Sequence, residues 1–127
     1  MSIHEIHGGI GNAALLFMLV AGVWGLIRWR RKLAIDQNYM GILIVGELLL
    51  LGQLLLGLYM MLGLGLAPPS DRPWLHYLYG FVTALTLPAV YAYTKGRTEE
   101  VSDQALYALV CLTIAALVYR AMTTAVF

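Results

Sequence analysis

The sequence contains few charged residues for its length. Only 12% of the 127 residues are charged, whereas 61% are hydrophobic. Soluble domains have about 25% charged and about 45–50% apolar residues. A water-soluble chain of this size would need more polar side chains to cover its surface. The composition therefore argues against an ordinary soluble domain and predicts an integral membrane protein in contact with the lipid bilayer.

Cysteine is also nearly absent, because Cys111 is the only one in the chain. A single cysteine excludes an intrachain disulfide, a zinc ribbon and a CxxC redox motif. Cys111 lies within an apolar run. We therefore expect it to be a small packing residue.

Motifs of soluble enzymes and of nucleic-acid-binding proteins are missing as well. The chain has no Gly-rich phosphate loop, no Ser-His-Asp arrangement, no HExxH motif and no basic patch with interleaved aromatic residues. No basic segment precedes the first apolar run, so we expect a retained span rather than a cleaved signal peptide. These absences predict no nucleic-acid partner and argue against an enzyme that acts on its own.

Four long apolar segments are present, and they predict transmembrane helices at about residues 9–29, 39–66, 74–94 and 104–124. About 20 helical residues cross a hydrocarbon core of about 30 Å. The segment APPSDRPW separates the second helix from the third, and Pro88 predicts a kink in the third. Ser102 or Asp103 is the expected N-cap of the fourth. The predicted fold is all-α, a single integral membrane four-helix bundle over residues 1–127 with up-down topology.

Positive charge is distributed unequally among the connectors. Six of the eight Lys and Arg residues lie in the first and third connectors, and the second connector contains Arg72 alone. Cytoplasmic loops carry the excess of Lys and Arg, so both termini are expected outside. Helix contacts are expected at small residues four positions apart, such as Ala21 with Gly25 and Gly8 with Asn12.

A short repeat contains the residues of greatest chemical interest. His7 is followed four positions later by Gly11, and His76 is followed in the same way by Gly80. In an up-down bundle the first and third helices run in the same direction, so the two histidines are expected at the same depth near the outer surface. A glycine one turn deeper would leave room beside each imidazole.

This pair of histidines suits a flat macrocycle between two helices. Neutral imidazoles are good axial ligands of haem iron, and four-helix bundles bind cofactors between facing helices. The haem propionates would then lie near the outer surface, where Arg72, Arg120 or tyrosine hydroxyls could bind them.

Other interpretations of the histidines stay open. They could be interfacial side chains without a ligand, part of a quinone head-group site, or ligands of a chlorophyll magnesium or another metal. His4 and Glu5 could join them in a zinc or copper site.

Glu47 is the other unusual residue, because it is an acidic group within the second apolar segment. A charge at that position would be costly, so we expect the carboxyl group to be protonated or paired. Gln53, Tyr91 or a residue of another subunit are candidate partners. Glu47 could serve a proton or quinone site, or it could be a polar clamp between helices.

Three segments carry a family resemblance: HGGIGNAALLFMLVAGVWGLIRWRR, ELLLLGQLLLGLYMMLG and RPWLHYLYGFVTALTLPAVYAYTKGR. They resemble small four-helix proteins of bacterial energy-transducing membranes, and the general pattern looks like a minimal cytochrome b561-type bundle. The resemblance implies a multi-pass protein of the bacterial plasma membrane. A full b561-type protein has a histidine pair at each membrane face, but this chain lacks the inner pair. One haem is therefore expected, without electron transfer across the whole membrane by this chain alone.

The sequence thus predicts a small membrane subunit of a respiratory or photosynthetic electron-transfer complex, associated with other membrane subunits. It would bind one b-type haem through His7 and His76, with Gly11, Gly80 and Arg120 at the same site. A cofactor-free structural or assembly subunit is one alternative. A small transporter or quinone-site protein that uses Glu47 and Arg120 is the other.

Overall fold

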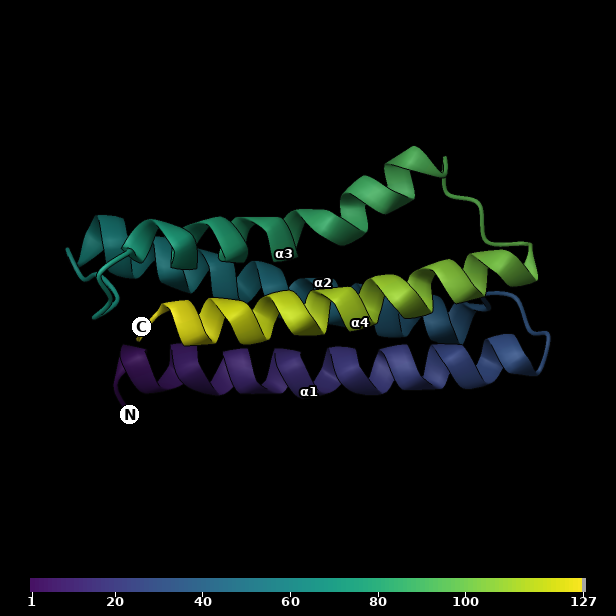
Figure 1. Ribbon diagram of the computed structural model, residues 1–127, viewed down its shortest axis with the longest axis horizontal. Coiled ribbons are helices and arrows are strands. Elements are labelled where there is room, and N and C mark those ends of the chain that lie inside the picture. The colour runs from purple at the N-terminus through teal and green to yellow at the C-terminus, as the bar shows by residue number, and fades with distance from the viewer. Residues whose placement is uncertain (127) are drawn as a thin grey trace.

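The computed structural model describes residues 1–126, which form a bundle of four long α-helices lying lengthwise (Figure 1). A short π-helical turn, η1, continues the second helix without a break. The described residues contain no β-strand, so the all-α prediction is confirmed. The elements are α1 (Ile3–Arg30), α2 (Gln37–Leu58), η1 (Tyr59–Gly63), α3 (Pro73–Tyr93) and α4 (Val101–Thr124).

Three helical segments of residues 1–126 are long and apolar enough to cross a membrane, namely Ile3–Arg30, Gln37–Gly63 and Val101–Thr124. They are the apolar spans that a membrane protein requires. The sequence of α3 is less apolar, because it contains one histidine, four tyrosines and two threonines among its 21 residues.

The start of α1 places two histidines on a regular helix. Ser2 is the N-cap, and its side chain accepts a hydrogen bond from the backbone N–H of Glu5 at 3.2 Å. This contact satisfies one of the free N–H groups of the first turn. His4 and His7 therefore lie on α1 itself, whose first helical residue is Ile3.

The start of α4 differs from the expected one. The N-cap is Glu100, and the Asp103 side chain accepts a hydrogen bond from the Glu100 backbone N–H at 3.0 Å. The predicted cap at Ser102 or Asp103 was therefore wrong, because Asp103 occupies the N3 position of a capping box.

The second helix loses its regular α geometry near its end. From Tyr59 the backbone forms the π-helical turn η1, which ends at Gly63, before Leu66 where the predicted segment ended. Gly65 then adopts a φ of 66°. Glycine takes this left-handed conformation without the steric cost that a side chain would add, so the chain can turn toward α3 here.

Small residues allow α1 and α4 to pack closely. Ala21 and Gly25 are buried on α1, as the sequence predicted. A Cβ atom on Gly25 would lie only 2.8 Å from the Cβ of Ala108 on α4. The other predicted pair was wrong, because Gly8 and Asn12 are exposed.

Helices α2 and α3 complete the bundle. Helix α1 packs against α2 and α4, and α3 packs against the same two helices, so α1 and α3 are diagonal to each other. Pro88 lies within α3. Proline removes a helical hydrogen bond and clashes with the preceding turn. Figure 1 shows the last part of α3 bending away from α4, in agreement with the predicted kink.

The connections lie at alternate ends of the bundle (Figure 1). The N-terminus and the end of α4 lie together at one end, near the connection between η1 and α3. The other two connections, which carry most of the basic residues, lie at the opposite end.

Candidate functional site

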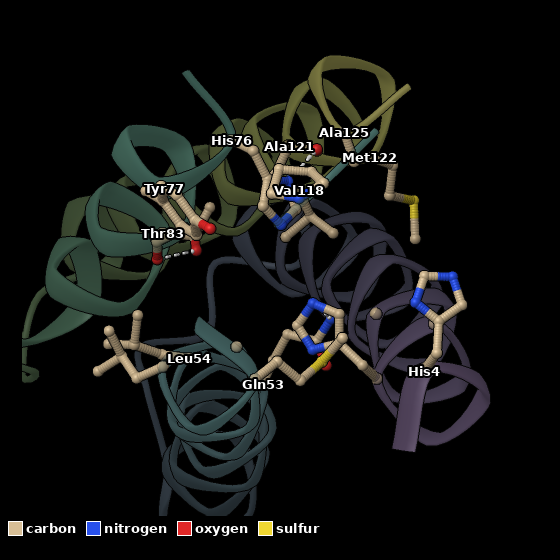
Figure 2. Close-up of a pocket in the computed structure, with 18 of the residues that line it drawn as sticks. His4, Gln53, Leu54, His76, Tyr77, Thr83, Val118, Ala121, Met122 and Ala125 are labelled. Atoms are coloured by element: carbon tan, nitrogen blue, oxygen red, sulfur yellow. Dashed lines mark hydrogen bonds between the residues drawn. The ribbon is translucent and has the colours of Figure 1, made fainter. Parts of the chain in front are cut away.

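A cavity of about 380 Å³ lies among all four helices, at the end of the bundle that carries both termini. Its lining is mainly apolar, with contributions from Ala14, Leu50 and Val118. Figure 2 shows His76 reaching into this space from α3, with Gln53 on α2 across from it and His4 to one side on α1. Volumes of about 300–1,000 Å³ are typical of ligand pockets. The side chains of the lining that carry polar atoms are His4, His7, Gln53, His76, Tyr77 and Thr83.

His7 and His76 meet in this cavity although α1 and α3 are diagonal in the bundle. Their ring centroids are 6.2 Å apart, and the ring planes are inclined by 72°. The two rings therefore face each other edge to face. The expected juxtaposition of these histidines is present in the structure.

The His76 ring is held in one orientation by a backbone carbonyl. Its Nδ1 atom lies 2.6 Å from the carbonyl oxygen of Ala121 on α4. A carbonyl oxygen can only accept a hydrogen bond, so Nδ1 donates its proton to it. In the neutral ring the Nε2 lone pair is then free. This tautomer, with Nδ1–H bound to a carbonyl group, is the usual one for a histidine that ligates a metal.

His7 has one weak partner and one unpartnered nitrogen. Its Nε2 lies 3.5 Å from the side-chain nitrogen of Gln53 on α2. Its Nδ1 is buried and has no hydrogen-bond partner among the described residues, and the same is true of Gln53 Oε1. Buried polar atoms of folded proteins nearly always have a partner, so these two atoms have hydrogen-bonding capacity to offer a ligand or water.

The two glycines of the repeat both line the cavity, but in different surroundings. A Cβ atom on Gly11 would lie 3.0 Å from the Gln53 side-chain nitrogen and 3.3 Å from Cε of Met122. A Cβ atom on Gly80 would have no atom within 4 Å. The open space is therefore beside α3, and Gln53 occupies the side next to Gly11.

Arg120 and Glu47 do not line the cavity. Arg120 is exposed, and its guanidinium carbon lies 5.9 Å from the centre of the Tyr79 ring. Glu47 lies on α2 three residues before Leu50, which does line the cavity. These two residues, which the sequence suggested for a transporter or quinone site, do not form one site together.

Among residues 1–126 no three His, Cys, Asp or Glu side chains are placed to hold a metal ion together. His4, Glu5 and His7 therefore do not form a zinc or copper centre with His76. The chemistry available to the cavity is that of three imidazoles, one amide and two hydroxyl groups in mainly apolar surroundings.

Sequence reasoning missed the place of Gln53 and the role of Arg28. Gln53 was considered only as a partner of Glu47, but it lies beside His7. The sequence indicates a special position for Gln53, because Glu47 and Gln53 are the two polar residues of the segment GELLLLGQLLLG. Arg28 belongs to the basic residues of the first connector that predict the orientation of the chain, but its side chain is only 11% exposed.

Arg28 connects three segments at the end of the bundle opposite the cavity. Its Nε donates to Gln104 Oε1 on α4 at 2.9 Å, and one terminal nitrogen donates to the Ala34 carbonyl at 2.6 Å. The other terminal nitrogen lies 3.4 Å from the Asp36 carboxylate, which caps α2. Arg28 therefore joins α1, the first connector and α4.

A second ion pair stabilises the third connector. Nε of Arg97 lies 2.8 Å from Oδ1 of Asp103. Donation of this hydrogen bond to the carboxylate of Asp103 raises the pKa of the Arg97 guanidinium. Asp103 thus both completes the capping box of α4 and binds the loop before it.

Comparison of the chain with protein-family models, with curated proteins and with solved structures found no significant match.

Proposed function

We propose that this protein is a small membrane subunit of an electron-transfer complex, and that it binds one b-type haem through His7 and His76. The observation that carries this proposal is the meeting of the two imidazoles, from α1 and α3, inside a largely apolar cavity. Helices α1 and α3 do not pack extensively against each other. Their histidines therefore converge across the interior of the bundle.

The distance between the two ring centroids matches that of two imidazoles on one metal, and ligation would also require both rings, which now lie edge to face, to turn a nitrogen toward it. Metal–imidazole nitrogen bonds are about 2.0–2.1 Å long for zinc, and similar lengths put the centres of two imidazoles on opposite sides of one metal about 6 Å apart. The observed separation of the ring centroids is 6.2 Å. The His76 tautomer with a free Nε2 fits the same role. The side-chain N–H of Gln53 donates to His7 Nε2, so His7 would have to release Gln53 before this nitrogen could ligate a metal.

The remaining residues of the cavity would position the group and exclude water. The Ala121 carbonyl holds the His76 ring, and Gly80 leaves its side of the cavity open. Haem supplies one-electron chemistry, and the polarity of its surroundings and the hydrogen bonds to its ligands tune its potential. Arg72 caps α3 near the cavity end, and Arg120 lies on the outside of α4; these are our proposed contacts for the propionates.

We propose four membrane spans in up-down order, with both termini outside, in a bacterial plasma membrane. The ribbon connections at alternate ends and the basic residues gathered at the end opposite the termini support this orientation. Helix α3 would be the remaining span, in addition to the three apolar segments Ile3–Arg30, Gln37–Gly63 and Val101–Thr124. Its tyrosines lie near its two ends, where aromatic residues favour the membrane interface.

Partners would be lipid and other membrane subunits. One face of α2 exposes large aliphatic side chains, including Ile44, Leu48, Leu51 and Leu55. An apolar face of this kind suits lipid tails or the helices of a neighbouring subunit.

The test is to measure haem in protein purified from a membrane extract in mild detergent. A pyridine haemochrome assay should find close to one b-type haem per chain. His76→Ala and His7→Ala should each remove most of it, because each removes an axial ligand. His4→Ala is the matched control, since His4 lines the same cavity but is not paired with either ring, and it should keep the haem. Folding of each variant is checked by circular dichroism and gel filtration.

Two results would refute the proposal: wild-type protein without haem, or haem retained in full after His76→Ala.

A quinone head-group site is the second candidate, because Gln53 Oε1 and His7 Nδ1 are buried and unpartnered in an apolar cavity. Quinone extracted from haem-free wild-type protein, and lost after Gln53→Leu, would favour it. Haem-free, quinone-free protein found only with partner subunits would favour a structural role.

A further inference from the structure

Glu47 is a half-buried acidic residue of α2 that the proposed haem site does not use. Both oxygen atoms of its carboxyl group are buried, and neither has a hydrogen-bond partner among the described residues. It lies near the middle of α2, within a helical segment that is long and apolar enough to cross a membrane. Both oxygens therefore lack the water and the donors that a carboxylate needs.

The helices packed against α2 offer Glu47 no partner. On α1, His7 lies beside Gln53, and Arg28 is bound to Gln104, Ala34 and Asp36.

On α3, His76 binds the Ala121 carbonyl. Tyr91 lies against Gly96 of the third connector, where a Cβ atom would be 2.9 Å from the tyrosine oxygen. Neither Gln53 nor Tyr91, the partners suggested by the sequence, forms a hydrogen bond with Glu47. No ion pair between Glu47 and a cation exists within residues 1–126.

An ionised carboxylate in such surroundings would be very costly, whereas a neutral carboxylic acid has no net charge to desolvate. The group therefore needs a bound proton. Buried titratable groups inside membrane segments commonly belong to proton pathways, and Glu47 has neither a cation nor a donor to explain it as a structural clamp.

The cavity lies close to Glu47 along α2. Leu50 and Leu54 lie one and two turns beyond Glu47 on the same side of α2, and both line the cavity. Leu50 is about 4.5 Å further along the helix axis. Gln53 also lines the cavity, and its buried Oε1 is unpartnered. Unsatisfied polar atoms of this kind are where proteins hold internal water.

We propose that Glu47 is a proton-binding site in the membrane interior and that it exchanges its proton with water through the cavity, past Gln53. This site goes beyond the haem proposal and does not depend on it. A protonated Glu47 is expected whether the cavity holds a haem, a quinone or only water.

The first test is infrared spectroscopy of the full-length protein in lipid at neutral pH. The spectrum should contain the carbonyl stretch of a protonated carboxylic acid, and Glu47→Gln should remove it. Glu5→Gln is the matched control, because Glu5 is exposed near the start of α1, and it should leave the band unchanged. A wild-type spectrum without the band, or a band that survives Glu47→Gln, would overturn the proposal.

Exchange with solvent tests the route. Transfer of the wild-type protein to D2O should shift the Glu47 band, and Gln53→Leu should slow that shift at least severalfold while leaving the band itself in place. Leu54→Ile, which changes the lining without changing its polarity, should exchange at the wild-type rate. An exchange rate that is the same in Gln53→Leu as in the wild type would show that the route past Gln53 is wrong.

A chemical test on the wild-type protein avoids any variant that fails to fold. Dicyclohexylcarbodiimide reacts with protonated carboxyl groups in apolar surroundings. The acid O–H adds across one C=N bond of the reagent, and no atom leaves. Mass spectrometry of the digested protein should find this adduct on Glu47. Labelling confined to the exposed carboxylates would contradict the proposal.

Discussion

Arg28 forms the most extensive set of polar contacts made by one side chain in the described structure. Its guanidinium binds a side chain of α4, a backbone carbonyl of the first connector and the residue that caps α2. Hydrogen bonds to charged groups contribute about 1.5–3 kcal/mol each, and loss of one partner leaves the others buried and unsatisfied. Arg28 is therefore a structural residue as well as part of the basic cluster of the first connector.

Replacing Arg28 with glutamine should destabilise the protein by about 2 kcal/mol or more, because Gln104 Oε1 and the Ala34 carbonyl lose their donor. The measurement is the apparent melting temperature in detergent, followed by circular dichroism. Arg30→Gln is the control, since Arg30 is exposed and forms no ion pair with the described residues. Equal melting temperatures for the two variants would contradict this account of Arg28.

The contacts of a residue can be predicted from the sequence when they depend on its depth along a helix, but not when they depend on the rotation of the helix about its axis. His7 and His76 could be paired from the sequence, because the depth of a residue along a membrane helix follows from its distance to the helix ends. The contacts of Gln53 and Arg28 depend instead on the rotation of α2 and α4 about their axes. A segment such as LLLLGQLLL has no polar face, so nothing in the sequence fixes that rotation.

At the scale of the helices, the contact between α1 and α4 depends on residues without large side chains. Gly25 lies against Ala108 of α4 and the Tyr39 side chain of α2. The Tyr39 hydroxyl donates a hydrogen bond to the Ala21 carbonyl at 2.7 Å. Close backbone approach supplies the packing that lipid does not drive.

Gly25→Ala should therefore destabilise the bundle by about 1–3 kcal/mol, because the added methyl group overlaps two buried neighbours. Gly8→Ala is the matched control. Its Cβ atom would have no atom within 4 Å, so the gain in helix propensity should leave stability equal or slightly higher. The apparent melting temperature in detergent distinguishes the two variants. A Gly25→Ala protein as stable as the wild type would mean that α1 and α4 are less closely packed than described.

The ends of the helices were harder to foresee than their existence. Long apolar runs predict the helices α1, α2 and α4 directly, and α3 begins at Pro73, because proline suits the first turn of a helix. The cap of α4 was misassigned because Glu100, Ser102 and Asp103 all have oxygen atoms that can cap a helix. The choice of Glu100 depends on the pair between Arg97 and Asp103, which fixes the backbone of the connector.

At the scale of the whole molecule, the proposed orientation can be tested by labelling in intact cells. Cysteine replacing Ser2 should react with a membrane-impermeant maleimide added outside, whereas cysteine replacing Lys32 should react only after the membrane is broken. Cys111 is buried and serves as the internal control in the wild-type chain. Labelling of the Lys32 position in intact cells would reverse the orientation, and labelling of both positions would argue against the spans.

The histidine pair and Glu47 are the two unusual features of the bundle, and both lie in or close to the same cavity. The histidine pair lies in the cavity near the termini, and Glu47 lies just beyond the cavity lining on α2. The opposite end is held by the contacts of Arg28 and by the Arg97–Asp103 pair. One end of the molecule thus contains the candidate site, and the other contributes polar contacts that stabilise the helices.

The central claim is that His7 and His76 together ligate one haem iron, and electron paramagnetic resonance of the oxidised protein tests it most directly. Two axial imidazoles give a low-spin ferric signal. We expect this signal in the wild-type protein and in His4→Ala, and its loss in His7→Ala and His76→Ala. A high-spin signal in the wild type, or no haem signal at all, would contradict the claim.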